Sequence, residues 1–157
     1  EKFSGNGSSR SRFLAFQSMF EKLKIKYAYS IAFDAEELYW ECLIKSMQPI
    51  STVVELIKSI SNQGLLICAL TDMQARIQVM KLRALGLENC IDFLVTSEEV
   101  GAEKPDRRVF ELALNKMNLR SNDVFMVGDN IEKDIIGARN LGVDAWLVQD
   151  EDIRYFR

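Results

Sequence analysis

The stretch VFMVGDNIEKDIIGARNLGVDAWLV, residues 124–148, shows most clearly which fold this chain adopts. Val124–Val127 is a short apolar run typical of a strand covered on both faces. Ile131–Leu141 has the spacing of an amphipathic helix, which Gly142 ends. Ala145–Val148 is a second apolar run. Because a strand, a helix and a further strand follow one another so closely, this stretch predicts two parallel strands joined by a helical crossover.

The same alternation extends backward along the chain to Pro49. Two more apolar runs, Leu65–Leu70 and Phe93–Thr96, predict strands. Helical stripes separate them: Ile50, Val53, Val54, Ile57 and Ile60; Met73, Ile77, Met80 and Ala84; Val109, Leu112 and Ala113, in a helix that Pro105 opens. Four strand-then-helix alternations predict an α/β fold, a doubly wound parallel sheet with mostly buried strands and helices on both faces.

The first 48 residues differ from the rest because they look mainly helical. Apolar residues recur at helical spacing from Arg12 to Lys24, and a second helix is expected from Asp34, as its N-cap, to about Met47. We therefore expect two parts, a helical segment over residues 1–48 and an α/β core over residues 49–157.

Composition excludes several classes of function. The chain has 157 residues with 20 Lys+Arg, 23 Asp+Glu and no histidine, so Ser-His-Asp triads, Cys-His pairs and His-bearing metal sites are impossible. A net charge of −3 argues against an extended nucleic-acid surface, and no apolar run is long enough to span a membrane. Three cysteines without a CxxC pair favour reduced thiols and a cytoplasmic location.

Three polar clusters follow predicted strands. They are Thr71-Asp72, Lys104-Pro105 and Gly128-Asp129-Asn130, with Asp134 close behind the third. Because the carboxyl ends of parallel strands share one edge of a sheet, we expect these clusters to converge. A hydroxyl and helix-start amides suit phosphate oxygens, a lysine neutralises them, and carboxylates hold Mg²⁺. The pattern predicts a site for a phosphate group and Mg²⁺.

Each cluster also has a purely structural explanation. Thr71-Asp72 caps the following helix in this interpretation, and Lys104 is an exposed residue before a proline at a helix start. Asp129 and Asp134 then only favour the positive end of a helix. The occurrence of all three clusters in order, each after a strand, favours a shared site.

The sequence resembles a known family at these clusters. ALTD (Ala69–Asp72), EKPD (Glu103–Asp106) and VGDNIEKDIIGARNLG (Val127–Gly142) are similar to motifs two, three and four of the haloacid dehalogenase-like (HAD) hydrolases, and the likeness covers about Pro49–Val148. The pattern Gly-Asp-x4-Asp-x2-Gly-Ala resembles the capped, phosphatase-type subfamily. The resemblance implies a Rossmann-like core, and Arg12–Met47 then looks like part of the helical cap.

The resemblance also implies roles for individual residues. Thr71 and Lys104 would be catalytic, Thr71 binding the transferring phosphoryl group and Lys104 pairing with it and with the nucleophile. Asp72 would join them in substrate binding. Asp129 would ligate Mg²⁺, and Asp134 would be a further acidic ligand or would support it. The implied activity is Mg²⁺-dependent hydrolysis of a small phosphorylated metabolite through an aspartyl-phosphate.

The family's first motif, a strand ending in Asp-x-Asp-x-Thr, has no good match. The nearest stretch is Ile31–Glu37, where Asp34 would be the nucleophile and Glu36 the acid after a strand-like alternation from Tyr27 to Phe33. The second acid is then Glu, and the threonine is absent. We therefore expect that a preceding segment with the first strand is missing from this chain.

That first strand lies centrally in the family, between the strands that end at Thr71 and at Gly128. Those two strands should therefore not pair with each other, and residues near Tyr27–Phe33, unseen sequence or another chain should fill the place between them. Two alternatives to an enzyme remain: a pseudoenzyme or phosphate-binding module without a nucleophile, and a CheY-like receiver. The receiver fits less well, because receivers carry their acidic pair near the first strand.

Overall fold

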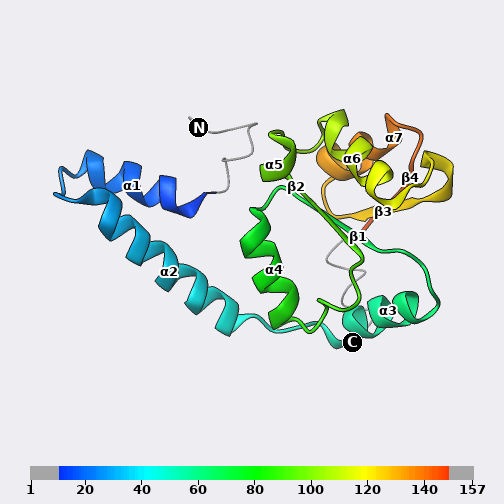
Figure 1. Ribbon diagram of the computed structural model, residues 1–157, viewed down its shortest axis with the longest axis horizontal. Coiled ribbons are helices and arrows are strands. Elements are labelled where there is room, and N and C mark those ends of the chain that lie inside the picture. The colour runs from blue at the N-terminus through cyan, green and yellow to red at the C-terminus, as the bar shows by residue number, and fades with distance from the viewer. Residues whose placement is uncertain (1–10, 149–157) are drawn as a thin grey trace.

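The computed structural model describes residues 11–148, so the outer ends of both predicted parts, residues 1–10 and 149–157, lie outside the described residues. The helices are α1 (Arg12–Lys22), α2 (Ala28–Ser46), α3 (Ser51–Asn62), α4 (Ala75–Ala84), α5 (Ser97–Val100), α6 (Arg107–Met117) and α7 (Gly137–Arg139). A 3₁₀ turn, η1 (Ser121–Asp123), and a π-helical segment, η2 (Ile131–Ile136), complete them. The strands are β1 (Cys68–Thr71), β2 (Phe93–Thr96), β3 (Phe125–Gly128) and β4 (Asp144–Leu147) (Figure 1).

The four strands form two parallel pairs. β1 pairs with β2, with Cys68 opposite Phe93, and β3 pairs with β4, with Phe125 opposite Asp144. All four predicted strands are confirmed; Phe93–Thr96 has the predicted bounds, and β1 begins three residues later than expected. The helices between the strands make this an α/β fold with parallel strands, as the sequence predicts.

No strand of the described chain joins the two pairs. β1 and β3 each lie at a free edge, because the sheets have the orders β1-β2 and β3-β4 only. This confirms the prediction that the two strands do not pair with each other. Residues 28–33 do not fill the place between them, since they belong to helix α2.

The hydrophobic core lies where α6 and α7 cover the strands. Its buried members are Val95, Ala102, Val109, Phe110, Ala113, Ala138 and Val143, with Cys68, Leu70, Met126 and Ala145 of the strands packed against them. Each strand thus contributes to this layer, and β1 does so with alternate residues, Cys68 and Leu70, as the two-residue period of a strand requires.

The opposite layer is incomplete. Helix α4 packs against β2, and Figure 1 shows α4 and α6 on opposite sides of β1 and β2. β3 and β4 have no such cover among the described elements, because Phe125, Val127 and Trp146 are 55%, 59% and 67% exposed. The prediction that all strands are mostly buried is therefore wrong for β3 and β4.

Helices α1 and α2 form a hairpin that projects away from the strands (Figure 1). α2 begins at Ala28, after Tyr27 in a left-handed conformation, so the prediction that Asp34 caps this helix is wrong. Ala28, Ala32 and Trp40 are its buried residues, whereas the apparent strand-like alternation from Tyr27 to Phe33 consists of exposed side chains. Small residues four apart let a helix pack closely, and this outweighs the alternation.

Two other helix boundaries differ from the predictions. α6 starts at Arg107 with Asp106 as its N-cap, and not at Pro105, because the Asp106 side chain accepts a hydrogen bond from the Arg108 amide. The predicted helix after Gly128 is π-helical before it becomes α7. None of the helices within residues 11–148 combines the length and the apolar character needed to span a bilayer.

Candidate active site at the ends of β1 and β3

Thr71 ends β1, and its hydroxyl group stabilises the turn that follows. The hydroxyl oxygen accepts a hydrogen bond from the Met73 amide at 3.1 Å, which is a Ser/Thr turn. The hydroxyl proton stays available to a ligand, since a hydroxyl both accepts and donates. Thr71 does not cap α4, whose N-cap is Gln74. The capping explanation for Thr71 is therefore wrong.

Asp72 has both carboxylate oxygens occupied. Oδ1 accepts a hydrogen bond from the Lys104 amide at 2.9 Å, and Oδ2 accepts one from Lys133 Nζ at 2.8 Å. The Asp72 backbone carbonyl accepts a third bond, from the Ser97 hydroxyl. Because these contacts reach the Lys104 loop, the start of α5 and η2, Asp72 fixes the loop after β1 to its neighbours.

Lys104 connects the two strand pairs. Its Nζ donates to Asp134 Oδ1 at 2.6 Å and to the Leu70 carbonyl at 3.2 Å, so it bridges the end of β1 and the segment after β3. The side chains of Lys104 and Asp134 are only 12% and 4% exposed. An ammonium has three N–H donors, which leaves one for a ligand. Lys104 is not the exposed lysine of the structural explanation.

Asp134 is held from both sides as well. Its Oδ1 pairs with Lys104, and its Oδ2 accepts a hydrogen bond from the Asn130 amide at 3.1 Å. Gly128 makes this position possible, because a Cβ at Gly128 would lie 2.5 Å from the Asp134 side chain. The backbone around Asp134 is π-helical, a conformation that often occurs at functional sites.

Asp129 differs from Asp134 in its surroundings. It is the first residue after β3, it is exposed, and it forms no ion pair among the described residues. A carboxylate with free oxygens at this edge fits a Mg²⁺ ligand, whereas each oxygen of Asp134 already accepts a hydrogen bond and keeps one lone pair for a metal. Within residues 11–148, no three acidic or cysteine side chains are grouped to hold a metal ion.

Sequence reasoning missed two residues at this site, Lys133 and Glu103. Lys133 Nζ donates to Asp72 Oδ2 and also to Glu103 Oε2, at 3.2 Å. Burial alone would lower the pKa of Lys133, but the hydrogen bonds to Asp72 and Glu103 outweigh it and raise this pKa above its ordinary value. Glu103 stands in the EKPD stretch, yet no pattern distinguished Lys133 from a solvated charge.

Asp34 and Glu36 are not at the site. Asp34 is exposed in the middle of α2, and the Glu36 carboxylate accepts a hydrogen bond from the Phe13 amide at the start of α1. The structure thus brings together Thr71, Asp72, Lys104 and Asp134, with Asp129 at the end of the adjoining strand, and leaves Asp34 on a helix.

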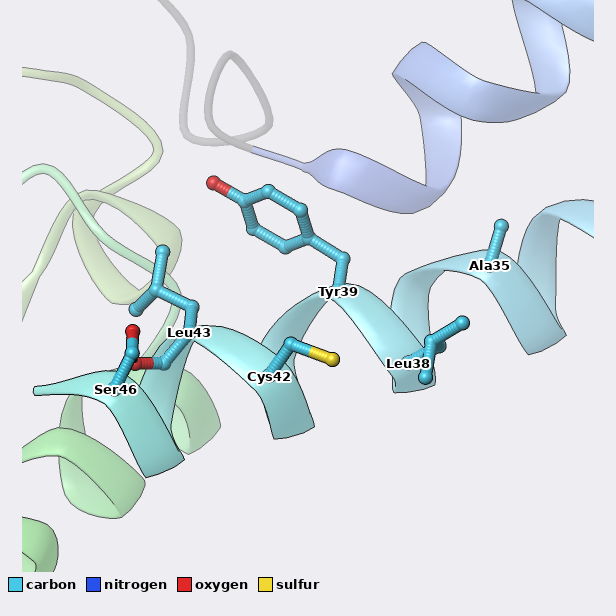
Figure 2. Close-up of a pocket in the computed structure, with 6 residues that line it drawn as sticks. All are labelled: Ala35, Leu38, Tyr39, Cys42, Leu43 and Ser46. Atoms are coloured by element: carbon cyan, nitrogen blue, oxygen red, sulfur yellow. The ribbon is translucent and has the colours of Figure 1, made fainter.

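A hollow of the surface lies elsewhere, on the helical hairpin. An open groove of about 610 Å³ runs along α2, and Figure 2 shows that its lining residues all come from this helix: Ala35, Leu38, Tyr39, Cys42, Leu43 and Ser46. The groove contains no charged side chain. It therefore lacks the chemistry that a phosphate requires, in contrast to the ends of β1 and β3.

Comparison with known proteins identifies the family. The model of the haloacid dehalogenase-like hydrolases matches residues 10–148. Ribulose-1,5-bisphosphate 5-phosphatase of Halopiger xanaduensis is 32% identical over 143 residues, which is 91% of this chain and 60% of that protein. Pyrimidine 5'-nucleotidase YjjG of Escherichia coli is 31% identical over 134 residues, which is 84% of this chain and 57% of that protein. The chain thus spans less than two thirds of either relative.

A solved structure supports the fold. The 2-haloacid dehalogenase of Pseudomonas syringae pv. Tomato DC3000 superposes with a TM-score of 0.74 at 23% identity, covering 85% of this chain and 56% of that one. The motifs, the parallel strands and these matches agree, and the chain belongs to the haloacid dehalogenase-like hydrolases.

Proposed function

We propose that this chain carries most of the active site of a Mg²⁺-dependent phosphatase, which hydrolyses a small phosphate monoester through an aspartyl-phosphate. The observation that carries the proposal is the Lys104 ammonium, which is held between the ends of β1 and β3 with one donor to spare. Relatives named as phosphatases support the reaction class.

Thr71 and Lys104 are the proposed contacts to the transferring phosphoryl group. The Thr71 hydroxyl donates to one phosphate oxygen, since its oxygen is already bonded to the Met73 amide. The free N–H of Lys104 donates to another oxygen and stabilises the negative charge that develops there. Because Lys104 is largely buried, it needs little reorganisation when the phosphate binds.

The charge at this edge of the strands supports a divalent cation. Lys104 and Lys133 pair with the carboxylates of Asp72, Glu103 and Asp134, and Asp129 directly follows β3. Two positive charges against these four negative ones leave −2. Such a site repels a phosphate dianion. Mg²⁺ would neutralise this excess and polarise the phosphate oxygens. Asp129 is the proposed ligand, with Asp134 holding Lys104 beside it.

The nucleophile is proposed to come from a strand between β1 and β3. The two free edges there present unpaired backbone groups, and the Lys104 bridge lies at their carboxyl ends. A strand in this place would deliver the side chain after its last residue to Lys104. Preceding sequence of the same protein is one source of the strand, and another chain is the second.

The projecting α1–α2 hairpin is proposed to belong to a cap. This retains the division into residues 1–48, a partial helical cap, and residues 49–157, the core. The hairpin contacts α4, where the Trp40 ring lies against Lys81 in the second half of that helix. A cap of this kind would limit which substrates reach the site. The proposed substrate is a small phosphorylated metabolite, and the proposed location of the protein is the cytoplasm.

A second candidate function is phosphate binding without turnover. It is favoured by one observation: of Asp72 and Asp129, the carboxylates that directly follow β1 and β3, Asp72 has both oxygens hydrogen-bonded and Asp129 is the proposed metal ligand, so neither is free to attack a phosphate. A protein with this site and no added nucleophile would bind phosphate and release it unchanged.

Phosphate binding by the 157-residue chain tests the site itself. We expect inorganic phosphate to bind in the presence of Mg²⁺ and more weakly without it, measured by calorimetric titration. Asp129→Asn should remove the effect of Mg²⁺. Asp123→Asn is the matched control, because Asp123 is a surface partner of Arg120 away from the site. Equal binding by the Asp129 and Asp123 variants would contradict the proposal.

A further inference from the structure

Lys133 stands out because it holds two acidic side chains that come from different loops. Its Nζ lies 2.8 Å from Asp72 Oδ2, after β1, and 3.2 Å from Glu103 Oε2, before α6. Neither acid has another cationic side chain within ion-pair distance among the described residues. Lys133 therefore neutralises a buried acidic pair that would otherwise push the two loops apart.

The contacts continue from Asp72 to Lys104. Asp72 Oδ1 accepts the hydrogen bond of the Lys104 amide, so the carboxylate that Lys133 fixes also fixes the Lys104 backbone. Glu103 precedes Lys104 directly in the chain and is held by the same ammonium. The Lys104 amide is thus tied to Lys133 through Asp72, and the residue before it, Glu103, is bonded to Lys133 directly.

Lys133 also comes from the segment that holds the other end of the bridge. It precedes Asp134, the carboxylate that pairs with the Lys104 ammonium, and its own amide is bonded to the Asn130 side chain. The short segment after β3 therefore holds Lys104 in two ways. Asp134 bonds the Lys104 side chain, and Lys133 holds the Lys104 backbone through Asp72.

We propose that Lys133 is a positioning residue of this site, whose ammonium ties Asp72 to Glu103 and thereby holds Lys104 where its ammonium reaches both Asp134 and the Leu70 carbonyl. The inference rests on the proposed phosphatase function for its catalytic consequence. It adds a residue that acts through Lys104 and touches no substrate.

The buried oxygen of Glu103 fits this role. Glu103 Oε1 is buried and has no hydrogen-bond partner, while its side chain is 9% exposed. Since Oε2 is bonded only to Lys133, this ammonium is the contact that makes the burial of the Glu103 charge tolerable. Removing it leaves two uncompensated carboxylates next to Lys104.

The test compares Lys133→Met, which removes the ammonium, with Lys133→Arg, which keeps a cation. Lys116→Met is the matched control: Lys116 also bonds a carboxylate, Glu99, and a backbone carbonyl, and its side chain is 28% exposed against 29% for Lys133. Lys104 accessibility is read by the rate at which an amine-reactive label modifies it, followed by mass spectrometry.

We expect Lys133→Met to raise the labelling rate of Lys104 several-fold, with Lys133→Arg and Lys116→Met close to wild type. Phosphate affinity in the presence of Mg²⁺ should fall by about tenfold in Lys133→Met, because losing one well-placed hydrogen bond to a charged group weakens binding by about this much. The loss of phosphate affinity caused by Lys133→Met should be smaller in a protein that already carries Asp72→Asn. The effects of two substitutions are not additive when the residues act through the same contacts.

Unchanged Lys104 labelling in Lys133→Met would overturn the inference, and so would a loss of phosphate affinity that Asp72→Asn leaves at full size. The labelling needs no activity. If wild-type protein binds no phosphate, the proposed function fails, while the labelling of Lys104 still decides whether Lys133 positions it.

Discussion

The β1–β2 pair and the β3–β4 pair have the same length and the same parallel pairing, yet their burial differs. Val95 at the third position of β2 is fully buried, whereas Val127 at the third position of β3 is 59% exposed. Helices α4 and α6 both pack against β2. β3 and β4 are instead contacted by η2, and β4 also by α7, so only one of their faces is covered. The difference shows that this chain supplies one complete layer and part of a second.

The incomplete layer leaves one face of β3 and β4 uncovered. Phe125, Val127 and Trp146 form an apolar face there, and helix α3 has no buried residue although its stripe of Val53, Ile57 and Ile60 is strongly amphipathic. Apolar surface of this kind is normally covered in a protein. A strand between the pairs would join the two sheets and place cross-strand neighbours beside Val127.

Breaking the link between the two pairs should have the largest effect. Lys104→Met leaves Asp134 buried without a counter-charge, which costs about 3–5 kcal/mol of unfolding free energy. Lys45→Met is the control, since Lys45 pairs with Glu41 on the exposed face of α2 and its loss should cost less than about 0.5 kcal/mol. Urea unfolding measures both. Similar midpoints for the two variants would show that the Lys104 bridge does not hold the pairs together.

The difference in burial between the pairs is tested by one substitution made twice. Val95→Ala should lower the free energy of unfolding by about 2 kcal/mol, because it removes buried methyl groups from the core. Val127→Ala should change it by less than about 0.5 kcal/mol in this chain, because the side chain is exposed.

The same two substitutions also test the proposal that a further strand lies between β1 and β3. When a strand occupies the place beside β3, Val127→Ala should become costly, and Val95→Ala should keep its cost. A Val127→Ala effect as large as that of Val95→Ala in the 157-residue chain would mean that the β3–β4 face is covered without any addition.

Much of the fold could be predicted from the sequence because its signals are local. The apolar run Phe93–Thr96 forms a strand as predicted, and Gly142 follows the end of a helix at positive φ, as expected. The predicted cluster of Thr71, Asp72, Lys104 and Asp134 at one edge follows from parallel strands alone.

The rest depends on contacts distant in sequence. The alternation at Tyr27–Phe33 indicated a strand, but burial of Ala28 and Ala32 decides for a helix. Lys133 was missed because its partners lie 61 and 30 residues away. The exposed face of β3 could not be predicted either. Its apolar sequence indicates that its side chains favour burial, but not whether a neighbouring element is present to bury them.

A smaller effect is expected at Cys68 in β1, on the covered pair. Burial raises the pKa of the Cys68 thiol to about 11, so at about pH 8 it should react slowly with a disulfide reagent, while the exposed Cys42 reacts readily. A thiol count over time measures this. Equal rates for the two cysteines would contradict the burial of β1.

The raised pKa also predicts a pH effect on stability. The folded protein keeps the Cys68 proton longer than the unfolded chain, whose thiol titrates near 9, so the contribution is present below pH 9 and is lost as pH rises toward 11. Cys68→Ala should therefore lose less stability than wild type between these values. An identical decline in both proteins would show that Cys68 does not titrate on unfolding.

Hydrolysis of an aryl phosphate with Mg²⁺ tests the central claim most directly, measured for residues 1–157 and for the chain extended by a strand ending in Asp-x-Asp-x-Thr. We predict no turnover by residues 1–157, because loss of the nucleophile costs several orders of magnitude in rate. The extended protein should be active, and Asp129→Ala should abolish that activity. Turnover by residues 1–157 that Asp34→Asn stops would contradict the account, since the nucleophile would then lie in α2.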